Sequence, residues 1–559
     1  MKNIVIDYLK KVTSLPKEEI EKIIETPPSS NLGDYAFPCF VLAKTFKESP
    51  AFIASKLVKE IKSDYFEKVE ARGPYVNFFI NRKKLAKEIL FSILKEKDKY
   101  GSQKDKKTIM VEFSQANTHK AFHVGHIRAT SIGESISRIL EFHGNKAIRA
   151  NYQGDTGMHV AKWIWCYKRY HSKEELKKDE SWISSIYVEA VRKLSENETL
   201  QEEVDEINRK LEERKDKELM KLWKTSRDYS LEAFEKIYSE LNTKFDKYYF
   251  EREVEERAKE ISKELVKKRI AKIDGGATII DFGDSLGIWV LLRKDGTVLY
   301  SAKDLALAEK KFKDYKLDKA IATIGAAQFL HTSQITKALE LMKFLHVKNY
   351  EFIHFSEVRL PSGKMSSRTG ENILYSDFMK EVKEYAISAI MKRHEKINEK
   401  EIQNRALKIS VASIKYALLK QDSNKVIVFN KEEALNFEGN TGPYLLYSYA
   451  RAKSILRKAK YNQNKEKNLE ITNISDKERI LINRLAAFPD ITNQSYLNLS
   501  PNTIANYTYQ LAQEFNEFYH SSKVIGSDEE SFRLSLVDAF SQVLKNSINL
   551  LGIEVIEKM

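Results

Sequence analysis

Apolar residues along this chain fall either into short continuous runs or into longer stretches with helical periodicity. Between the apolar runs at 108–113 and 146–155, the apolar positions predict a helix that begins near Val124 and continues past ILEFHG. Strands that alternate with helices are typical of a parallel sheet, so we predict an α/β core. Four short runs predict its buried strands: TIMVEF (108–113), KAIRANYQGD (146–155, strand and turn), AIATIG (320–325) and NYEFIHF (349–355).

The segments on either side of this core have a different character. The N-terminal part predicts a small α+β module, in which a helix begins at Ser49-Pro50 and YVNFFI (75–80) forms a strand. A charged stretch at 95–107 predicts a linker without regular structure. The C-terminal part is helical in pattern, with turn breaks and basic helices. We therefore predict three domains, at 1–103, 104–385 and 386–559.

Two features interrupt the central domain. From about 168 to 270 the chain is densely charged, with apolar residues at helical spacing, which predicts a helical insertion with solvated faces. Asp274-Gly275 and Asp295-Gly296 each stand between strand-like runs and predict hairpins. No internal repeat is visible in the sequence.

Composition narrows the class of protein. With 20 glycines and 10 prolines in 559 residues, collagen-like and low-complexity classes are excluded. No run approaches the ~18 apolar residues of a membrane span, and the charged N-terminus does not resemble a signal peptide. Cys39 and Cys166 lie far apart and predict neither a disulfide nor a metal site, so we expect a reducing, cytoplasmic location.

Charge leaves two interpretations open. Lysine and arginine number 94 against 80 aspartates and glutamates, a net charge of +14, with an isoelectric point near 9.1. Such an excess suits a phosphate-rich partner such as a nucleic acid. A solvated, lysine-rich surface is the simpler explanation of charge alone.

The most specific local feature is His123-Val124-Gly125-His126, between a predicted strand and a helix. A helix N-terminus carries partial positive charge and unpaired N–H groups that suit a phosphate. Gly125 leaves room for an adenine ring or ribose against the backbone, and the imidazoles can donate hydrogen bonds as charge builds on a phosphoryl group. The alternatives are a histidine pair on a helix surface or half of a zinc site, although no further ligands follow at zinc spacing.

A second candidate is the Gly/Ser loop PSGKMSS (361–367), which carries one lysine, Lys364. A mobile loop with a lysine can clamp a pyrophosphate and release it. By itself this loop is better explained as an ordinary basic loop. The HVGH motif follows the first strand of the sheet and this loop follows the last, and parallel strands bring their carboxyl ends to one edge where ligands bind.

Together the two motifs resemble the signatures of class I aminoacyl-tRNA synthetases. The residues around them are similar to one family of that class, the arginyl-tRNA synthetases. That resemblance implies a Rossmann-like catalytic domain, an N-terminal α+β module that contacts tRNA, and a helical anticodon-binding domain. The segments that carry it are VEFSQANTHKAFHVGHIRATSIGES (111–135), NYQGDTG (151–157), LYSAKDLA (299–306), NLGDYA (31–36) and the terminal Glu557-Lys558-Met559.

The chain departs from the family pattern at several positions. Ala116 stands where a proline is common, Thr156 replaces a frequent tryptophan and His159 a frequent glutamine. The second signature lacks its usual second lysine. In such family members a lysine usually precedes the first signature, and Lys120 stands at that place, so the resemblance assigns it to the ATP phosphates.

The resemblance also implies the site residues. It gives catalytic roles to Lys120, His123, His126 and Lys364, and ATP contacts to Gly125, Lys120, Lys364, Met365, Ser366 and Ser367. It implies an arginine pocket formed by Glu112, Gln115, Ala116, Asn117, His126, Tyr300, Asp304 and Gln328. A guanidinium does require a fixed carboxylate.

Simpler interpretations remain for three of these residues. Tyr300 is equally a core aromatic, and Gln328 equally a hydrogen-bonding loop residue. Ser301-Ala302-Lys303-Asp304 fits S-x-x-D, a variant of the helix capping box, in which Asp304 would only satisfy a helix N-terminus.

The C-terminal domain predicts contacts with RNA. Aromatic and basic side chains can stack unpaired bases and contact phosphates, although several of these aromatics at helical spacing belong to the core. The candidate residues are Tyr444, Tyr447, Tyr449, Arg451, Lys453 and Arg457, and the polar segment from Asn430 to Thr441 is a further candidate.

The function implied is that of an arginine–tRNA ligase. L-Arginine reacts with ATP, accompanied by Mg²⁺, to give arginyl-adenylate, and arginine then passes to the 3′ end of tRNA(Arg). We expect no structural metal, no membrane contact and a monomer. One rival is the cysteinyl enzyme, which two isolated cysteines disfavour because it requires a zinc site. Another is a catalytically dead RNA-binding paralogue, which the intact histidines and Lys364 disfavour.

Overall fold

The computed structural model describes residues 2–29, 32–359, 374–392, 398–462 and 469–559. The chain forms two compact units, and each is described by itself. The first consists of Met1–Lys97, Ile455–Ala486 and Glu514–Gln542, and the second of Asp98–Ser454, Ala487–Gln513 and Val543–Met559. Among the described residues, no helix combines the length and apolar character needed to span a membrane.

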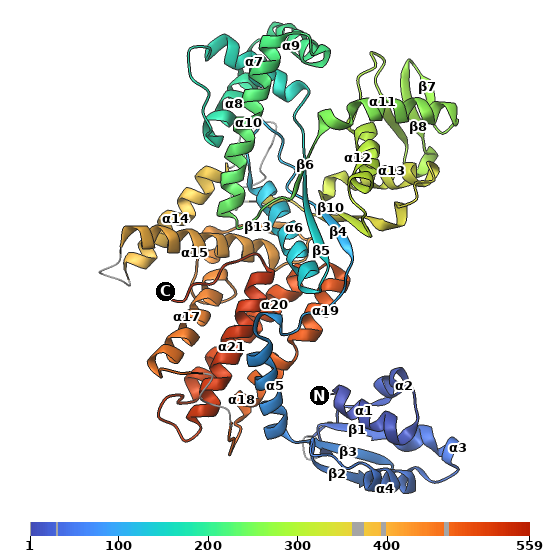
Figure 1. The fold of residues 1–559 in the computed structure, drawn as a ribbon, viewed down its shortest axis with the longest axis vertical. Coiled ribbons are helices and arrows are strands. Elements are labelled where there is room, and N and C mark those ends of the chain that lie inside the picture. Colours follow the sequence, from blue (N-terminus) through green and yellow to red (C-terminus); the bar gives the residue numbers. More distant parts are fainter. Residues whose placement is uncertain (1, 30–31, 360–373, 393–397, 463–468) are drawn as a thin grey trace. The chain divides into compact units, whose positions relative to one another are not determined.

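A parallel sheet organises the second unit (Figure 1), which confirms the predicted α/β fold class. Every neighbouring pair of its strands is parallel. The order reverses between β4 and β10, and such a switch point opens a crevice at the carboxyl ends of the strands. The strands in spatial order are β11 (Tyr350–Phe355), β10 (Lys319–Gly325), β4 (Thr108–Glu112), β5 (Lys146–Gln153) and β6 (Lys247–Phe250).

Helices cover both faces of this sheet. On one face, α11 (Glu251–Lys267), α12 (Tyr300–Asp314) and α13 (Phe329–Leu341) share a core with the strands, to which Ile148 and Ala150 of β5 belong. On the other face, α6 (Val124–Phe142) packs against β4, β5 and β10. Adjacent residues of a strand face opposite ways, so Arg149 points toward α6.

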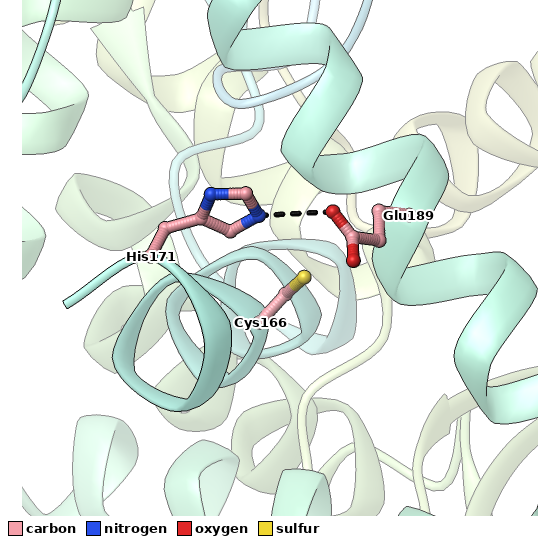
Figure 2. A group of neighbouring side chains, drawn as sticks. All are labelled: Cys166, His171 and Glu189. Carbon is pink, nitrogen blue, oxygen red and sulfur yellow. Dashed lines mark hydrogen bonds and ion pairs between the residues drawn. The ribbon is translucent and has the colours of Figure 1, made fainter. Parts of the chain in front are cut away.

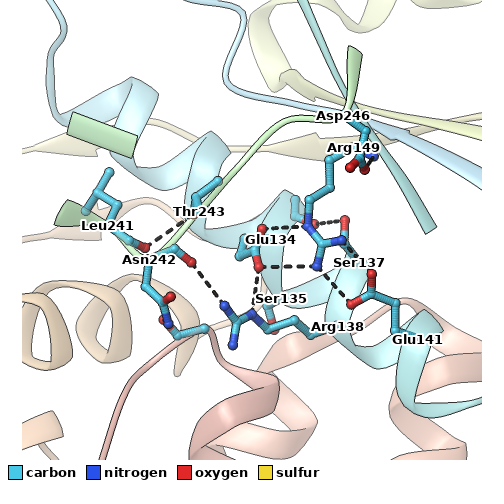
Figure 3. A network of polar contacts seen from close by, with 12 residues as sticks. Glu134, Ser135, Ser137, Arg138, Glu141, Arg149, Leu241, Asn242, Thr243 and Asp246 are labelled. Atoms are coloured by element: carbon cyan, nitrogen blue, oxygen red, sulfur yellow. Dashed lines mark hydrogen bonds and ion pairs between the residues drawn. The ribbon is translucent and has the colours of Figure 1, made fainter. Parts of the chain in front are cut away.

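Buried ion pairs fix α6 on the sheet (Figure 3). Arg149 Nε lies 2.9 Å from a carboxylate oxygen of Glu134, and Arg149 Nη1 lies 2.6 Å from Glu141. Arg138 pairs with Glu134 at 2.6 Å and donates to the carbonyl of Asn242 at 3.0 Å. Glu134 is 2% exposed, so its buried negative charge needs these partners. The network holds the helix that carries the HVGH motif in register with β5.

The predicted insertion is helical over most of its length. Four helices follow β5 and share one apolar core: α7 (Met158–Tyr170), α8 (Glu180–Glu196), α9 (Gln201–Glu213) and α10 (Lys217–Glu240). The predicted range, about 168–270, extends too far toward the C-terminus, because the chain rejoins the sheet at Lys247, where β6 pairs with β5. This four-residue strand lies between charged helices and has no periodicity of its own to reveal it.

A small antiparallel sheet precedes α12. It contains β7 (Lys272–Asp274), β8 (Ala277–Asp281) and β9 (Ile288–Leu292). Gly275 and Gly276 form the predicted turn between the first two strands. The turn at Asp295-Gly296 is also present, closed by a bridge between Leu292 and Val298, but TVLY forms no strand because α12 begins at Tyr300.

Helices follow the sheet in the second unit. A short two-stranded pairing joins β12 (Val358–Arg359) to β13 (Ile427–Val428). Three helices cross the boundary between the two units: α17 (Gly442–Lys458), α20 (Pro501–Ser521) and α21 (Glu530–Leu550). The others in the second unit are α14 (Tyr375–Met391), α15 (Glu399–Leu419), α16 (Lys431–Ala434) and α19 (Phe488–Asn498).

The first unit contains the N-terminal α+β module and α18 (Asp476–Ala486). Its sheet orders β1 (Tyr35–Pro38), β3 (Tyr75–Ile80) and β2 (Phe66–Arg72), and only β3 had been predicted. The Ser49 hydroxyl caps α4 as predicted. α5 continues to Glu96, so the predicted linker begins as helix. The helices of the module are α1 (Lys2–Thr13), α2 (Lys17–Ile23), α3 (Ala43–Phe46), α4 (Pro50–Glu60) and α5 (Arg82–Glu96).

Candidate active site

The HVGH motif forms the start of α6, directly after the loop that leaves β4. His123 is the N-cap residue, and its Nδ1 accepts a hydrogen bond from the backbone N–H of Gly125 at 3.1 Å. His126 Nδ1 accepts in turn from the backbone N–H of His123 at 3.2 Å. The two imidazole rings stack with their centroids 3.8 Å apart. The motif is therefore a reciprocal cap that holds both rings at the helix N-terminus.

Each of these imidazoles presents one N–H donor. Because Nδ1 accepts a backbone N–H in both rings, the proton of the neutral form lies on Nε2. Burial, with the charge of Lys120 nearby, lowers the pKa of His123 to about 4. Burial and the neighbouring His123 and Lys120 hold the pKa of His126 well below its usual value. Both rings are neutral at pH 7, so two Nε2–H groups meet the positive end of the helix dipole.

Gly125 lies close to the ring of His123. A Cβ at this position would lie 3.0 Å from Cε1 of the His123 ring, tighter than ordinary side-chain contacts. The sequence interpretation assigned this space to an adenine ring or ribose. In the structure the close neighbour of the glycine is the first imidazole of the motif.

The loop before α6 is anchored to the insertion. His119 is buried with φ of +63°, its backbone N–H donates to Ser230 Oγ at 3.1 Å, and its ring Nε2 lies 2.9 Å from Ser226 Oγ. Both serines belong to α10. The left-handed backbone persists because these contacts over-determine it. Next to it, burial and the charge of Lys162 lower the pKa of Lys120. The charge of Lys120 in turn lowers the pKa of both His123 and His126, so Lys120 lies near the histidine pair.

The second signature, with Lys364, Met365, Ser366 and Ser367, lies outside the described residues. Its flanks are described. β12 ends at Arg359, and Leu374 forms a bridge with His123. The backbone N–H of Tyr375 donates to the carbonyl of Phe122 at 2.8 Å. The chain that leaves the second signature therefore runs directly against the first.

Glu112, at the end of β4, is buried with its charge already paired. Its Oε2 lies 2.6 Å from Lys311 Nζ, and its Oε1 accepts from Gln115 Nε2 at 2.6 Å. Lys311 Nζ also donates to the hydroxyl of Tyr350 at 2.8 Å. Burial opposes a charged lysine here, but the carboxylate of Glu112 outweighs it and raises the pKa of Lys311. Glu112 is therefore a neutralised member of a buried triad.

The other residues expected in this loop hold it to the end of β5. The backbone N–H of Gln115 donates to Asn151 Oδ1 at 3.1 Å, and Asn117 Oδ1 accepts from the backbone N–H of Gly154 at 3.2 Å. A Cβ at Gly154 would lie 2.5 Å from that Asn117 oxygen, so a larger residue would displace the Asn117 side chain. Ala116 is fully buried. The NYQGD segment thus positions the loop that the resemblance assigns to arginine.

Asp304 and Tyr300 share a neighbour, His331 of α13. Asp304 Oδ2 lies 2.7 Å from His331 Nε2, and the Tyr300 ring packs edge-on against the imidazole at 4.6 Å. Trp289 Nε1–H donates to His331 Nδ1 at 3.3 Å, so neutral His331 carries its proton on Nε2 and donates it to Asp304. Burial is the largest cause of the raised pKa of Asp304.

The capping-box interpretation of Asp304 is wrong. Helix α12 begins at Tyr300 with Leu299 as its N-cap residue and no side-chain cap bond. The Ser301 hydroxyl donates to the carbonyl of Val290 instead. The core interpretation of Tyr300 is wrong as well, since this residue is 59% exposed. Gln328 is exposed in the short 3₁₀ turn that directly follows β10.

Three residues near this pocket were not assigned roles from the sequence. Lys311 and His331 neutralise or orient the two carboxylates, and nothing in their local sequence distinguishes them from surface or core residues. The hydroxyl of Tyr152 is buried and has no hydrogen-bond partner in the described part of the chain. Burial and then the charges of Asp304, Glu251 and Glu112 raise its pKa. Tyr152 stands in the NYQGD segment, which the resemblance had singled out as a block.

The proposed RNA-contacting residues of α17 differ in exposure. Tyr447 is 36% exposed, and its hydroxyl accepts from Arg451 at 2.9 Å while the guanidinium lies over its ring. Tyr449 is 5% exposed and belongs to the core. Tyr444 packs against Tyr509. The segment from 430 to 441 contains the short helix α16 rather than only a linker.

The fold and this site agree with comparisons to known protein families. A model described as "tRNA synthetases class I (R), catalytic domain" matches residues 89–430. "Arginyl tRNA synthetase N terminal domain" matches residues 1–80, and "DALR anticodon binding domain" matches 445–559. The parallel sheet with HVGH after its first strand is thus the catalytic domain of a class I aminoacyl-tRNA synthetase.

Relatives narrow the class to one family. An arginine–tRNA ligase of Clostridium perfringens is 37% identical, and one of Clostridium acetobutylicum 34% identical, each over the whole of both chains. The chain belongs to the arginyl-tRNA synthetase family. The same fold occurs in arginyl-tRNA synthetase of Thermus thermophilus, with a TM-score of 0.79 at 23% identity over the whole of both chains. It also occurs in the Plasmodium falciparum protein, with a TM-score of 0.74 at 23% identity over 98% of this chain and 99% of that one.

Proposed function

We propose that this chain is an arginine–tRNA ligase, which activates L-arginine with ATP and transfers arginine to the 3′ end of tRNA(Arg). The observation that carries the proposal is full-length similarity to arginine–tRNA ligases in a chain whose HVGH motif lies at the sheet switch point. Mg²⁺ enters with ATP as part of that substrate. The expected monomeric state and cytoplasmic location stay predictions.

In the first half-reaction, the carboxylate of arginine attacks the α-phosphorus of ATP and pyrophosphate leaves. Negative charge builds on the phosphoryl oxygens in the transition state. The Nε2–H groups of His123 and His126 are neutral donors held by backbone hydrogen bonds, so they meet this charge without first being reoriented. Lys120 adds a positive charge at the same helix end. Lys364 of the second signature is proposed to hold the pyrophosphate.

The two carboxylates of the pocket differ in what they can offer arginine. Glu112 is already neutralised by Lys311 at 2.6 Å. Among the described residues, the Asp304 carboxylate forms a hydrogen bond and ion pair only with the imidazole of His331. The side chain of Asp304 is 22% exposed. Its Oδ1 is therefore available to a guanidinium, which binds carboxylates best through paired N–H donors. We assign Asp304 as the guanidinium acceptor and Glu112 to the framework that holds Gln115.

Transfer of arginine requires contacts between the tRNA and regions outside the catalytic site. We propose that Tyr447 and Arg451 of α17 contact the anticodon side, because both are accessible on this helix. Unpaired bases stack on aromatic rings, and arginines contact phosphates. The N-terminal module is proposed to contact the body of the tRNA.

The test is a pyrophosphate-exchange assay with each of the twenty amino acids, with and without tRNA, followed by charging of a tRNA(Arg) transcript. We expect exchange with arginine alone among the amino acids, and charging of tRNA(Arg). The family commonly requires tRNA for the first step, so we expect exchange to depend on it. Exchange with a different amino acid, or RNA binding without any exchange, would overturn the proposal.

A further inference from the structure

The end of α7 brings together three side chains that can bind a metal ion (Figure 2). Cys166 lies on α7, His171 directly follows that helix, and Glu189 comes from α8. One potential ligand atom of each, a thiol sulfur, an imidazole nitrogen and a carboxylate oxygen, lies within 4.8 Å of the other two. All three belong to the insertion, and none of them is among the residues assigned to arginine or ATP.

The orientation of His171 is the one found at metal sites. Its Nδ1 lies 2.6 Å from a carboxylate oxygen of Glu174, and its Nε2 points toward Glu189 at 2.9 Å. Histidines that bind metals through one nitrogen usually donate the other N–H to a carboxylate, which fixes the ring. Glu174 is itself held, because Trp182 Nε1–H donates to its second oxygen at 3.2 Å. Glu174 thus fixes the ring through Nδ1, and Nε2 on the opposite edge faces the other two candidate ligands.

The separation of the ligand atoms is close to what a tetrahedral ion requires. With zinc–sulfur bonds of ~2.3 Å and zinc–nitrogen or zinc–oxygen bonds of ~2.0–2.1 Å, ligand atoms stand about 3.3–3.6 Å apart. The three potential ligand atoms lie within 4.8 Å of one another, so small side-chain rotations would bring them to this spacing, and His171 and Glu189, at 2.9 Å, only have to separate slightly. Cys166 is fully buried, whereas the side chains of His171 and Glu189 are 20% and 28% exposed, which leaves one side open for a water molecule.

An ion pair alone explains the histidine and the glutamates but not the cysteine. His171 between Glu174 and Glu189 forms a charged bridge that needs no metal. Cys166 belongs to the apolar core of the insertion, which accounts for its burial, but the bridge gives its sulfur no partner because a sulfhydryl bonds only weakly to a carboxylate. A soft sulfur, an imidazole and one carboxylate together form a donor set that suits Zn²⁺ and disfavours Mg²⁺ or Ca²⁺.

We propose that Cys166, His171 and Glu189 form a zinc site with water as the fourth ligand, and that the ion ties the end of α7 to α8. The thiol and His171 Nε2 bind in their deprotonated forms, so binding releases protons to solvent and strengthens as the pH rises. The site is structural in effect. It stabilises the helical insertion against which the loop before α6 is anchored.

The experiment uses tag-free, full-length protein stripped of metal with a chelator and then titrated with Co²⁺. We expect one equivalent to bind with a sulfur-to-cobalt charge-transfer band in the near ultraviolet, and Zn²⁺ to displace the cobalt. Zn²⁺ should also slow alkylation of Cys166 at least tenfold, measured by peptide mass spectrometry. Cys39, the other cysteine and also buried, serves as the internal reference.

Variants separate a metal site from a packing cluster. Cys166→Ser should abolish the charge-transfer band, while the matched variant Cys39→Ser keeps it. Glu174→Gln should weaken cobalt binding about tenfold to a hundredfold, because the carboxylate behind the imidazole is lost. His171→Gln, which leaves the thiol in place, should remove tight binding, and circular dichroism checks that each variant is folded. A band that survives Cys166→Ser, or folded wild-type protein that binds neither ion, would overturn the proposal.

Discussion

Replacing Asp304 by asparagine should raise the KM for arginine while leaving the ATP KM little changed. The substitution keeps the shape of the side chain and one oxygen acceptor for His331, so the bond at 2.7 Å can persist. It removes the negative charge that the guanidinium would meet. The side chain of Asp304 is 22% exposed, so the loss falls at the lower end of the range for a broken buried pair.

The size of the effect follows from that burial. Breaking a buried charge pair costs roughly 3–5 kcal/mol, and we take about 3 kcal/mol for a partly exposed one. At ~1.4 kcal/mol per factor of ten, the arginine KM should rise about a hundredfold. Pyrophosphate exchange at varied arginine and at varied ATP separates the two constants, and the melting temperature reports any loss of fold.

Ser301→Ala is the matched control for damage to the start of α12. It removes the hydrogen bond from the Ser301 hydroxyl to Val290 and should cost ~1 kcal/mol of stability without a change in the arginine KM. If folded Asp304→Asn protein shows the wild-type arginine KM, Asp304 does not receive the guanidinium. The reasoning that distinguished it from Glu112 by the pairing with Lys311 would then be refuted.

Three further outcomes follow from the same structure. His126→Ala should lower the rate of adenylate formation by ~10² or more in single-turnover assays while the protein stays folded, because an oriented N–H donor is lost; an unchanged rate would exclude that role. Arg149→Met should lower the free energy of unfolding in urea by about 3 kcal/mol, because buried Glu134 is left with Arg138 as its remaining ion-pair partner; a loss below ~1 kcal/mol would show that Arg138 alone is sufficient. The pKa of His119 is lowered to about 3 by burial and then by the charge of Arg227, so unfolding takes up a proton and stability falls as the pH drops from 6.5 toward 3. Between pH 7.5 and 5, the His119→Gln variant should therefore lose less stability than the wild type, as measured by urea unfolding. The difference should reach up to ~2 kcal/mol, at ~1.4 kcal/mol per pH unit below 6.5, and equal losses would mean that folded His119 titrates normally.

Local patterns were sufficient for the elements that carry the nucleotide chemistry. Apolar runs predicted β4, β5, β10 and β11, and the change from strand to helical periodicity located the start of α6. The cap made by His123 and His126 is also local, since it joins residues three apart. Parallel strands end at one edge whatever their loops contain, so the sequence alone indicated that HVGH and the later loop converge.

The tertiary structure decided the charges and the partners. Glu112 and Asp304 look alike as isolated acidic residues, but Lys311 neutralises the first and His331 orients the second. β6 becomes a strand only because β5 offers it an edge, and four residues carry too little periodicity to predict this. Cys166 likewise gains its neighbours from a turn and from a second helix. Contacts between distant segments depend on strand order and helix packing, and no short window of sequence contains that information.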